Sequence, residues 1–381
     1  MEKHFKNIKV DNELEFTMDI YGLDTCIVNS FRRIVLGDVM SNAFGKIELE
    51  INTSIINTEI LSHRLSLIPL KIDEIEGEDV CVELNIKNNE YEMISVTSSD
   101  LKIITGDLYI IPDILIVKLE KGEEIKLKLY ITRNNGKNHA KYTPVSICSL
   151  KINEDVSINE SLWNKLKKTK QNKLRKFCKN TLDLKANHYL YKNSVGTYGF
   201  KEVNRNTKER IKVEIEKFLI NLGYSNEIIE NKSVLFNDQY YNKKYVYSFK
   251  FESHLVNPYK IFSRILFQLN RKIIYLQNKN IELEKNDIGV CFMIESEGHT
   301  MGNILANELQ KDPRVKYSYY KMKHPFDRKI ALYLILKNCK NETEEYAKIL
   351  ADSFKRILNL CKCLQVEWDS IIASNKEIIE I

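Results

Sequence analysis

Apolar side chains recur every three or four residues in three stretches of the chain, and each stretch predicts an amphipathic helix. The first spans about residues 24–37, the second 257–276 and the third 300–311. Asn257 can cap the second helix, where Pro258 suits the first helical position, and Thr300 is the expected N-cap of the third. The side chains expected to face inward are Ile27, Phe31, Ile34, Ile265, Leu269, Ile273, Met301, Ile304 and Leu305.

A fourth apolar stripe, near the end of the sequence, is longer than the others. Residues 338–381 contain no Gly and no Pro, and one face of the predicted helix carries Tyr346, Leu350, Ile357, Leu364 and Trp368. A single small domain cannot cover a stripe of this length. The pattern therefore predicts that this helix packs against a partner helix.

Segments in which polar and apolar residues alternate predict strands. They are expected in a hairpin over residues 1–22, at 46–51, 245–251, 289–294, 315–321 and 329–337, and in a β-rich block at 78–132. A helix with an adjoining strand and then a long helix occurs twice, at 24–51 with 245–276 and at 289–310 with 342–372. Polar residues 281–288 are the expected linker between the two copies.

The charge balance limits the classes of partner. Lys and Arg number 58 and Asp and Glu 52, so the formal net charge of +6 predicts at most a local basic patch. One basic run without acids lies within residues 161–179 and includes Lys167, Lys168, Lys173, Arg175 and Lys176. It is either a solvated helix face or loop, or a contact for nucleic acid or an acidic partner.

The residue types that carry catalysis or bind metals do not cluster. The eight cysteines contain no CxxC pair, and Cys361 and Cys363 would point apart on a helix, which predicts reduced, packed thiols. His299 has no nucleophile or paired carboxylate at a usable spacing, and Gly136-Lys137 lacks the upstream glycine of a phosphate loop. Without a signal-peptide core or a stretch of about 20 apolar residues, a soluble intracellular protein is expected.

Several short motifs resemble the α-type subunits of multisubunit RNA polymerases, a family that includes bacterial α, archaeal D and the third-largest subunit of the eukaryotic nuclear enzyme. Asn29-Ser30-Phe31-Arg32-Arg33-Ile34 is similar to that family's opening helix. Asn52-Thr53-Ser54 followed by residues 63–70 (HRLSLIPL) resembles a second block of the archaeal and eukaryotic members. Residues 136–145 (GKNHAKYTPV) resemble a third.

A separate set of motifs resembles the smaller partner of that family, archaeal L or the eleventh eukaryotic subunit. It comprises residues 297–305 (EGHTMGNIL), Asp312-Pro313 with Val315, and Tyr320-Lys321 with His324-Pro325. The L-like motifs directly follow the D-like motifs. The resemblance covers roughly residues 20–145, 245–277 and 289–370, and it leaves about 150–240 without a counterpart.

The resemblance implies an α+β fold with two α-subunit-type dimerisation units, each with helices packed on a small antiparallel sheet, joined through a four-helix interface. Residues 1–48 with 244–280 would form the first, discontinuous unit, and 289–381 the second. Residues 49–243 would be a β-rich insert domain. Both units carry apolar seams that need covering, so burial would favour the pairing by about 25 cal/mol per Å².

The resemblance also implies contacts with other polymerase subunits. Arg32 and Arg33 correspond to positions that contact the second-largest subunit, and His63, Arg64, His139 and Lys141 are similar candidates. The alternative is that Arg32 and Arg33 are ordinary surface residues. For His139 the alternative is a structural role as a hydrogen-bonded residue. The implied partners are the two largest polymerase subunits and small zinc-binding subunits, with DNA reached only through the complex and no homo-oligomer.

Two departures from the family pattern affect these expectations. Ser66 replaces a family glycine, which puts the local turn in question. Many D-like subunits bind zinc or an iron–sulfur centre in the insert, but Cys81, Cys148 and Cys178 are too widely spaced, so no metal and no cofactor are expected.

The predicted function is a non-catalytic scaffold that pairs the two halves in cis, and the alternative is a nucleic-acid-binding transcription module that uses residues 161–179. Fusion of the two subunits is associated with large nucleocytoplasmic DNA viruses. It therefore implies a viral source, with the protein in the host cytoplasm (virus factory) and the virion.

Overall fold

The computed structural model describes residues 4–12, 14–71, 80–153, 156–157, 246–254, 256–279, 281–286, 289–322, 324, 329–337 and 343–375, and short pieces between 169 and 221. The chain divides into two compact units. Unit 1 comprises Met1–Lys6, Asp19–Thr25 and Leu150–Ser248, and unit 2 comprises Asn7–Met18, Cys26–Ser149 and Phe249–Ile381.

The described part of unit 1 includes a small antiparallel sheet. Its strand order is β12-β14-β13, with bounds Val156–Ser157, Tyr198–Phe200 and Leu190–Lys192. Two hydrogen bonds also lie within this unit. The hydroxyls of Thr25 and Tyr247 are 2.7 Å apart, and Ser248 Oγ donates to Asp19 Oδ1 at 2.8 Å.

A four-stranded sheet joins the two ends of the predicted D-like domain. Its order is β1-β2-β15-β11, with bounds Phe5–Asp11, Glu15–Tyr21, Val246–Ser253 and Val145–Asn153. Two helices follow strands of this sheet in the sequence, α1 (Thr25–Gly37) after β2 and α8 (Pro258–Asn278) after β15. The Asn257 side chain accepts a hydrogen bond from the Tyr259 amide, so the predicted cap of α8 is confirmed.

The insert is built on a long two-stranded ribbon. Strands β3 (Met40–Asn52) and β10 (Glu124–Asn135) pair over most of their length, and β5 (Cys81–Lys87) and β7 (Lys102–Thr105) complete the sheet β3-β10-β5-β7. Strand β3 is longer than the predicted 46–51 and crosses the predicted domain boundary at 48/49 without a break.

Gly45 lies beside an irregularity in the pairing of β3 with β10, between Tyr130 and Ile131. A Cβ at this position would lie only 1.6 Å from Thr132 Oγ1, so the ribbon requires glycine here.

Shorter elements close the core of the insert. They are α2 (Thr58–Ser66), the strand pair β4 (Leu70–Lys71) with β8 (Tyr109–Ile110), the pair β6 (Ile94–Thr97) with β9 (Leu115–Leu119), and the 3-10 turns Ser98–Asp100 and Ala140–Tyr142. Apolar side chains of α2, β4, β6, β8 and β9 pack with the inner residues of β10, such as Leu127 and Leu129, in one buried cluster.

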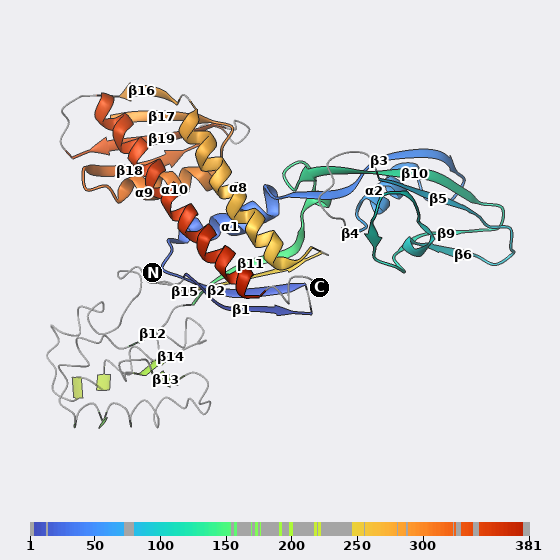
Figure 1. Ribbon diagram of the computed structural model, residues 1–381, viewed down its shortest axis with the longest axis horizontal. Coiled ribbons are helices and arrows are strands. Elements are labelled where there is room, and N and C mark those ends of the chain that lie inside the picture. Colours follow the sequence, from blue (N-terminus) through green and yellow to red (C-terminus); the bar gives the residue numbers. More distant parts are fainter. Residues whose placement is uncertain are drawn as a thin grey trace. The chain divides into compact units, whose positions relative to one another are not determined.

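The third four-stranded sheet, which is antiparallel, carries the last part of the chain. Its order is β16-β17-β19-β18, with bounds Glu282–Asn286, Gly289–Glu295, Lys329–Leu336 and Val315–Lys321. Helix α9 (His299–Gln310) packs on β18 and β19, and α10 (Thr343–Ser374) packs on α8 and α9. Figure 1 shows α10 and α8 lying against each other. The α+β fold class, with helices packed on small antiparallel sheets, is thus confirmed.

Two predictions were wrong in this region. Residues 281–288 were expected to be a linker, but 282–286 form β16, whose backbone pairs with β17 because the alternation of Glu282, Leu283 and Glu284 suits an edge strand. Thr300 was expected to cap α9. The helix instead begins at His299 after Gly298, and the Thr300 hydroxyl accepts a hydrogen bond from another helix.

An aromatic cluster holds α10 against the D-like elements. The ring centroid of Trp368 lies 4.5 Å from the centroid of Phe262 and 5.8 Å from that of Tyr259, both on α8. It lies 6.1 Å from the ring centroid of Phe16 on β2. Its indole Nε1 donates to Ser263 Oγ at 3.0 Å. Residues separated by a hundred or more positions therefore share one core.

Candidate functional site

A polar groove brings together three of the sequence motifs. It is lined by Arg32, Arg33 and Asp38 at the end of α1, Gly136 and Lys137 after β10, Lys272 on α8, and Glu297, Gly298 and Thr300 before and within α9. The D-like helix motif, the D-like loop motif and the L-like motif thus meet at one place. The groove therefore offers charged groups and hydrogen-bond donors and acceptors for binding.

An ion network crosses the floor of the groove. Lys272 Nζ lies 3.1 Å from Asp38 Oδ1 and 3.1 Å from Glu297 Oε1, and Lys137 Nζ lies 2.7 Å from the same Asp38 oxygen. Burial lowers the pKa of the Lys272 ammonium, but the two carboxylates raise it by more, and the net pKa is above its ordinary value. Lys272 is therefore charged, and it ties the D-like Asp38 to the L-like Glu297.

Gly136 explains why the loop motif begins with glycine. A Cβ at this position would lie 2.1 Å from the backbone oxygen of Leu36 and 2.7 Å from Thr143 Oγ1. The Lys137 amide donates to the Gly37 carbonyl at 3.1 Å. The loop therefore lies directly on the end of α1, which only glycine permits.

The two predicted arginines have different surroundings. Arg33 is exposed, and its Nε donates to Thr300 Oγ1 on α9 at 2.7 Å. Arg32 is half-buried, and its Nε donates to Asn29 Oδ1 in the same helix at 3.0 Å. Arg33 therefore contacts the L-like half of this chain, which the sequence did not indicate, and its contact with another subunit stays a prediction.

The four other predicted contact residues lie near one another in unit 2. The rings of His63 on α2 and His139 are 6.2 Å apart. Arg64 Nη2 donates to the Leu115 carbonyl at 2.9 Å, and Lys141 Nζ donates to the Phe44 carbonyl at 3.0 Å. Arg64 and Lys141 thus each stabilise the insert through a hydrogen bond to the backbone. The side chains of His63 and Arg64 are nevertheless exposed.

Ser66 does not distort the turn that follows α2. It is the last residue of the helix, and its hydroxyl donates to the His63 carbonyl at 2.8 Å. It is also absent from the described residues with a positive φ, so its backbone does not require glycine.

All fourteen predicted interface residues are buried: Ile27, Phe31, Ile34, Ile265, Leu269, Ile273, Met301, Ile304, Leu305, Tyr346, Leu350, Ile357, Leu364 and Trp368. Four residues that contact Trp368 were not predicted from the sequence: Phe16, Tyr259, Phe262 and Ser263. The ion network of Asp38, Lys272 and Glu297 was not predicted either. A charged residue inside an apolar helix seam, as Lys272 is, was the signal available for that network.

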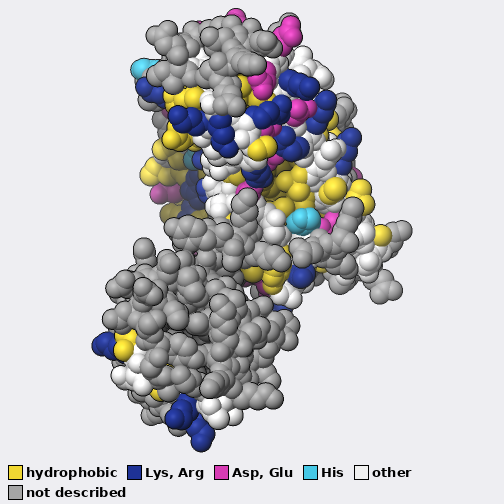
Figure 2. Space-filling model, turned by 90° about the vertical axis from the view of Figure 1, so that its left-hand side faces the viewer, with side chains coloured by type: hydrophobic (Ala, Val, Ile, Leu, Met, Phe, Trp, Pro, Cys, Tyr) yellow, Lys and Arg dark blue, Asp and Glu magenta, His cyan; other side chains and the backbone are white. Residues whose placement is uncertain are grey.

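The basic run lies mostly outside the described residues. Lys167, Lys168 and Arg175 belong to the part that is not described, whereas Lys173 and Lys176 are described and exposed. On the face drawn in Figure 2, Lys and Arg side chains of the described residues alternate with Asp, Glu and hydrophobic side chains. The run as a nucleic-acid contact stays a prediction.

Within the described ranges, no three His, Cys, Asp or Glu side chains are grouped so that they could hold a metal ion. None of the helices described has the length and apolar character that a bilayer crossing requires.

Two family models match this chain in separate places. The RNA polymerase Rpb3/RpoA insert domain matches residues 49–152, and the RNA polymerase Rpb3/Rpb11 dimerisation domain matches residues 290–367. The first match runs from the end of β3 into β11, and the second runs from β17 into α10. The chain thus contains regions similar to two kinds of domain of α-type polymerase subunits.

Curated relatives agree with these matches. The subunit RPAC1 of DNA-directed RNA polymerases I and III from Homo sapiens is 32% identical over 199 residues, which cover 41% of this chain and 57% of the relative. The polymerase subunit Rpo3 from Pyrococcus horikoshii is 33% identical over 170 residues, 42% of this chain and 64% of the relative. Subunit 3 of DNA-directed RNA polymerases II, IV and V from Arabidopsis thaliana is 29% identical over 178 residues, which cover 38% of this chain and 55% of the relative. The chain spans somewhat more than half the length of the relatives it matches.

Proposed function

We propose that this chain is a non-catalytic assembly subunit of a multisubunit DNA-directed RNA polymerase, in which a D-like and an L-like half pair in cis. One observation carries the proposal. A region similar to the insert of the larger α-type subunits and a region similar to the Rpb3/Rpb11 dimerisation domain occur in one chain. Helix α8, which lies between the two regions in the sequence, packs with α10 in the aromatic cluster around Trp368.

The short connection between the halves supports pairing within one molecule. Helix α8 ends at Asn278 and β16 begins at Glu282, so few residues separate the two halves. A short tether raises the effective concentration of one half near the other to about millimolar. It also fixes a one-to-one ratio of the halves, which two separate subunits must reach by diffusion.

The groove is the proposed contact for a large polymerase subunit. It displays an exposed guanidinium, Arg33, on a rigid helix, and such a group suits carboxylate or carbonyl recognition. The exposed pair His63 and Arg64 would extend the contact onto the insert. Small zinc-binding polymerase subunits are further proposed partners.

Affinity purification of the tagged full-length chain, followed by mass spectrometry, tests the proposal. The two largest polymerase subunits should copurify in a fixed ratio. A chain from which residues 161–179 are deleted should retain them, because the scaffold does not need the basic run. The alternative, a nucleic-acid-binding module, would be favoured by a different result. The full-length chain would then copurify with nucleic acid but with no polymerase subunit, and the deletion would abolish the bound nucleic acid.

A matched pair of variants tests Arg33. Arg33→Glu should weaken association with the large subunits at least tenfold while leaving the circular dichroism unchanged. Thr300→Val removes the hydrogen bond to Arg33 without changing any charge. If Thr300→Val weakens association equally, Arg33 acts only by bridging α1 and α9 within this chain.

The source and location stay predictions. A viral polymerase in the host cytoplasm and the virion is proposed because the two halves are fused. Detection of the chain in purified virus particles by mass spectrometry would test it.

A further inference from the structure

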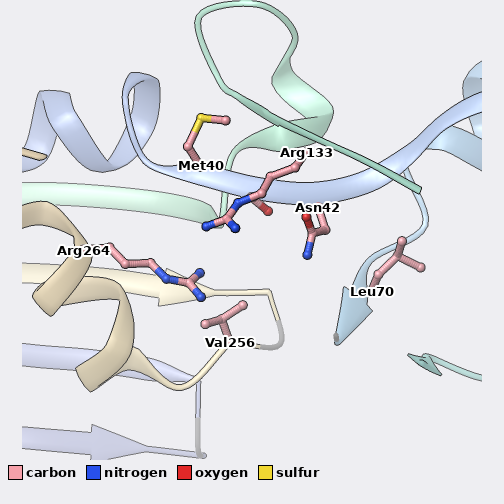
Figure 3. Close-up of a pocket in the computed structure, with 7 residues that line it drawn as sticks. Met40, Asn42, Leu70, Arg133, Val256 and Arg264 are labelled. Carbon is pink, nitrogen blue, oxygen red and sulfur yellow. The ribbon is translucent and has the colours of Figure 1, made fainter. Parts of the chain in front are cut away.

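The hollow between the insert ribbon and α8 is too small for a ligand. Its described lining includes Met40, Asn42, Arg133 and Arg264, and Figure 3 shows the guanidinium groups of Arg133 and Arg264 directed into the same space. Its volume of about 20 Å³ has room for one water molecule. A partner needs a more open surface, and the L-like sheet offers one.

The sheet β16-β17-β19-β18 has one face that points away from α9. Helix α9 packs on β18 and β19, and on that side the Tyr320 hydroxyl lies 3.3 Å from His299 Nδ1. Because side chains alternate along a strand, Tyr317, Tyr319 and Lys321 point to the opposite side. An antiparallel sheet with a helix on one face commonly presents polar side chains on the other.

This outer face is apolar instead, because backbone pairing aligns aromatic and aliphatic side chains across it. Tyr319 pairs with Tyr333 on β19, and Tyr333 pairs with Cys291 on β17. The rings of Tyr319 and Tyr333 are stacked, with their centroids 4.7 Å apart. The neighbouring rows add further side chains of this kind: Met293, Ala331, Tyr317 and Ile335.

The large side chains of the outer face are accessible. Tyr317 is 58% exposed and Tyr319 is 48% exposed, and Met293, Tyr333 and Ile335 are half-buried. Contiguous exposed apolar groups mark interaction surfaces. Tyr and Met are also enriched in protein interfaces, which have an apolar centre and a polar rim.

The two edges of the outer face carry opposite charges. On β18, Lys321 is exposed, and the Lys316 ammonium lies 5.6 Å from the ring centroid of Tyr317. On β16, the exposed Glu282 and Glu284 pair with residues of β17 that belong to the outer face. A nucleic acid is negative along its whole length and would be repelled by β16. Charge complementarity therefore indicates a polypeptide with an acidic flank toward β18 and a basic flank toward β16.

The dimensions of the face suit one helix. Neighbouring strands lie about 4.8 Å apart, so β16 and β18 are separated by about 14 Å, and a helix with its side chains is about 10–12 Å wide. Addition of a strand to β18 is less favourable, because Gln310 already occupies part of that edge. The Gln310 amide accepts from the Ser318 amide at 2.9 Å and donates to the Lys316 carbonyl at 3.3 Å.

We infer that this tyrosine face, defined by Glu284, Met293, Tyr317, Tyr319, Lys321 and Tyr333, binds an amphipathic helix of another polymerase subunit. The apolar stripe of that helix covers the tyrosines, its acidic flank faces Lys321 and its basic flank faces Glu284. The inference rests on the proposed function. None of the residues that define the face is among the described residues lining the groove around Arg33, so the face is a second contact.

Site-specific crosslinking in the purified complex tests the tyrosine face. p-Benzoylphenylalanine replaces the exposed Tyr317 in the tagged full-length chain, the complex is irradiated, and crosslinked peptides are identified by mass spectrometry. We expect a peptide of another polymerase subunit with apolar residues at helical spacing, flanked by acids on one side and bases on the other.

Charge reversals at the two edges test the orientation of the bound helix. Lys321→Glu and Glu284→Lys, each made alone, should reduce the crosslink about tenfold, which corresponds to about 1.4 kcal/mol. Lys355→Glu, at an exposed position of α10 outside the face, is the control and should leave it unchanged. Lys316→Glu replaces Lys321→Glu if the latter folds poorly by circular dichroism.

Several outcomes would overturn the inference. A crosslink to DNA or RNA that Glu284→Lys strengthens would identify a nucleic-acid surface, and a crosslink to a second copy would identify self-association. An intact complex without a crosslink, or with one that neither reversal reduces, would exclude the amphipathic helix while leaving the proposed function intact. A wild-type chain that copurifies with no polymerase subunit would instead overturn the proposed function, and this contact with it.

Discussion

Replacing Trp368 by Ala tests the contact on which the pairing of the two halves depends. Trp368 lies on the L-like helix α10 and is fully buried. Four described residues that it contacts through its ring or its indole N–H lie in the D-like half: Phe16, Tyr259, Phe262 and Ser263. If the halves pair as described, truncation of this one side chain removes the centre of their shared core.

The expected loss of stability follows from the buried area. A buried aromatic side chain of 150–250 Å² at about 25 cal/mol per Å² gives about 4–6 kcal/mol as an upper estimate. Trp→Ala substitutions in cores cost about 3–5 kcal/mol. Ser263 adds little, because its hydroxyl also donates to the Tyr259 carbonyl at 3.1 Å and keeps that partner. We therefore expect about 4 kcal/mol.

Urea denaturation followed by circular dichroism at 222 nm measures the change in the free energy of unfolding. Val366→Ala, two residues away on the exposed face of α10, is the control and should cost less than about 0.5 kcal/mol. A loss below about 1 kcal/mol for Trp368→Ala would refute the reasoning, because the helix would then not be packed on the D-like core.

Three further substitutions test the groove and the L-like domain. Lys272→Met should destabilise the chain by about 3 kcal/mol, because Glu297 then stays buried without its cation. Adding Glu297→Gln should restore part of the free energy of unfolding measured by urea denaturation. If it restores none, the ion pair is not the cause of the loss. Gly136→Ala should cost about 2 kcal/mol of stability, because the new Cβ meets the Leu36 backbone oxygen. Gly298→Ala is its control, since a Cβ at that position has no atom within 4 Å. Equal thermal midpoints for the two variants would contradict this account. The Arg314 guanidinium beside Asp312 holds the pKa of that carboxyl at about 2, below its usual 3.8. This ion pair therefore stabilises the fold fully above about pH 4 and progressively less as the pH falls toward 2. Asp312→Asn should flatten the dependence of the thermal midpoint on pH in this range, and an unchanged slope would exclude the pair as its source.

Patterns along the chain were sufficient to locate the helices. The spacing of apolar residues predicted α1, α8, α9 and α10, and the pair Asn257-Pro258 marked the start of α8, because caps and amphipathic stripes depend on residues within a few positions of one another. The buried face of each helix was predictable for the same reason. Every residue assigned to the predicted interface is buried.

Local patterns were a poor guide where a residue's role depends on a distant partner. Thr300 has the right residue type for a cap, yet it accepts a hydrogen bond from Arg33, which lies 267 positions away in the sequence. Residues 282–286 show a different failure: they are polar enough for a linker, yet they form a hairpin with the next strand, β17. Backbone pairing there replaced the unpaired connection that the polar composition suggested.

The ion network and the aromatic cluster exist only because the chain folds back on itself. Asp38 and Glu297 are ordinary charges in the sequence, and only the packing of α1, α8 and the loop before α9 brings both carboxylates within 3.1 Å of the Lys272 ammonium. Phe16 likewise meets Trp368 across more than three hundred residues. Hydrophobic periodicity specifies which face of an element is buried, but it carries no information about which other face will cover it, and this choice depends on the free energy of the whole fold.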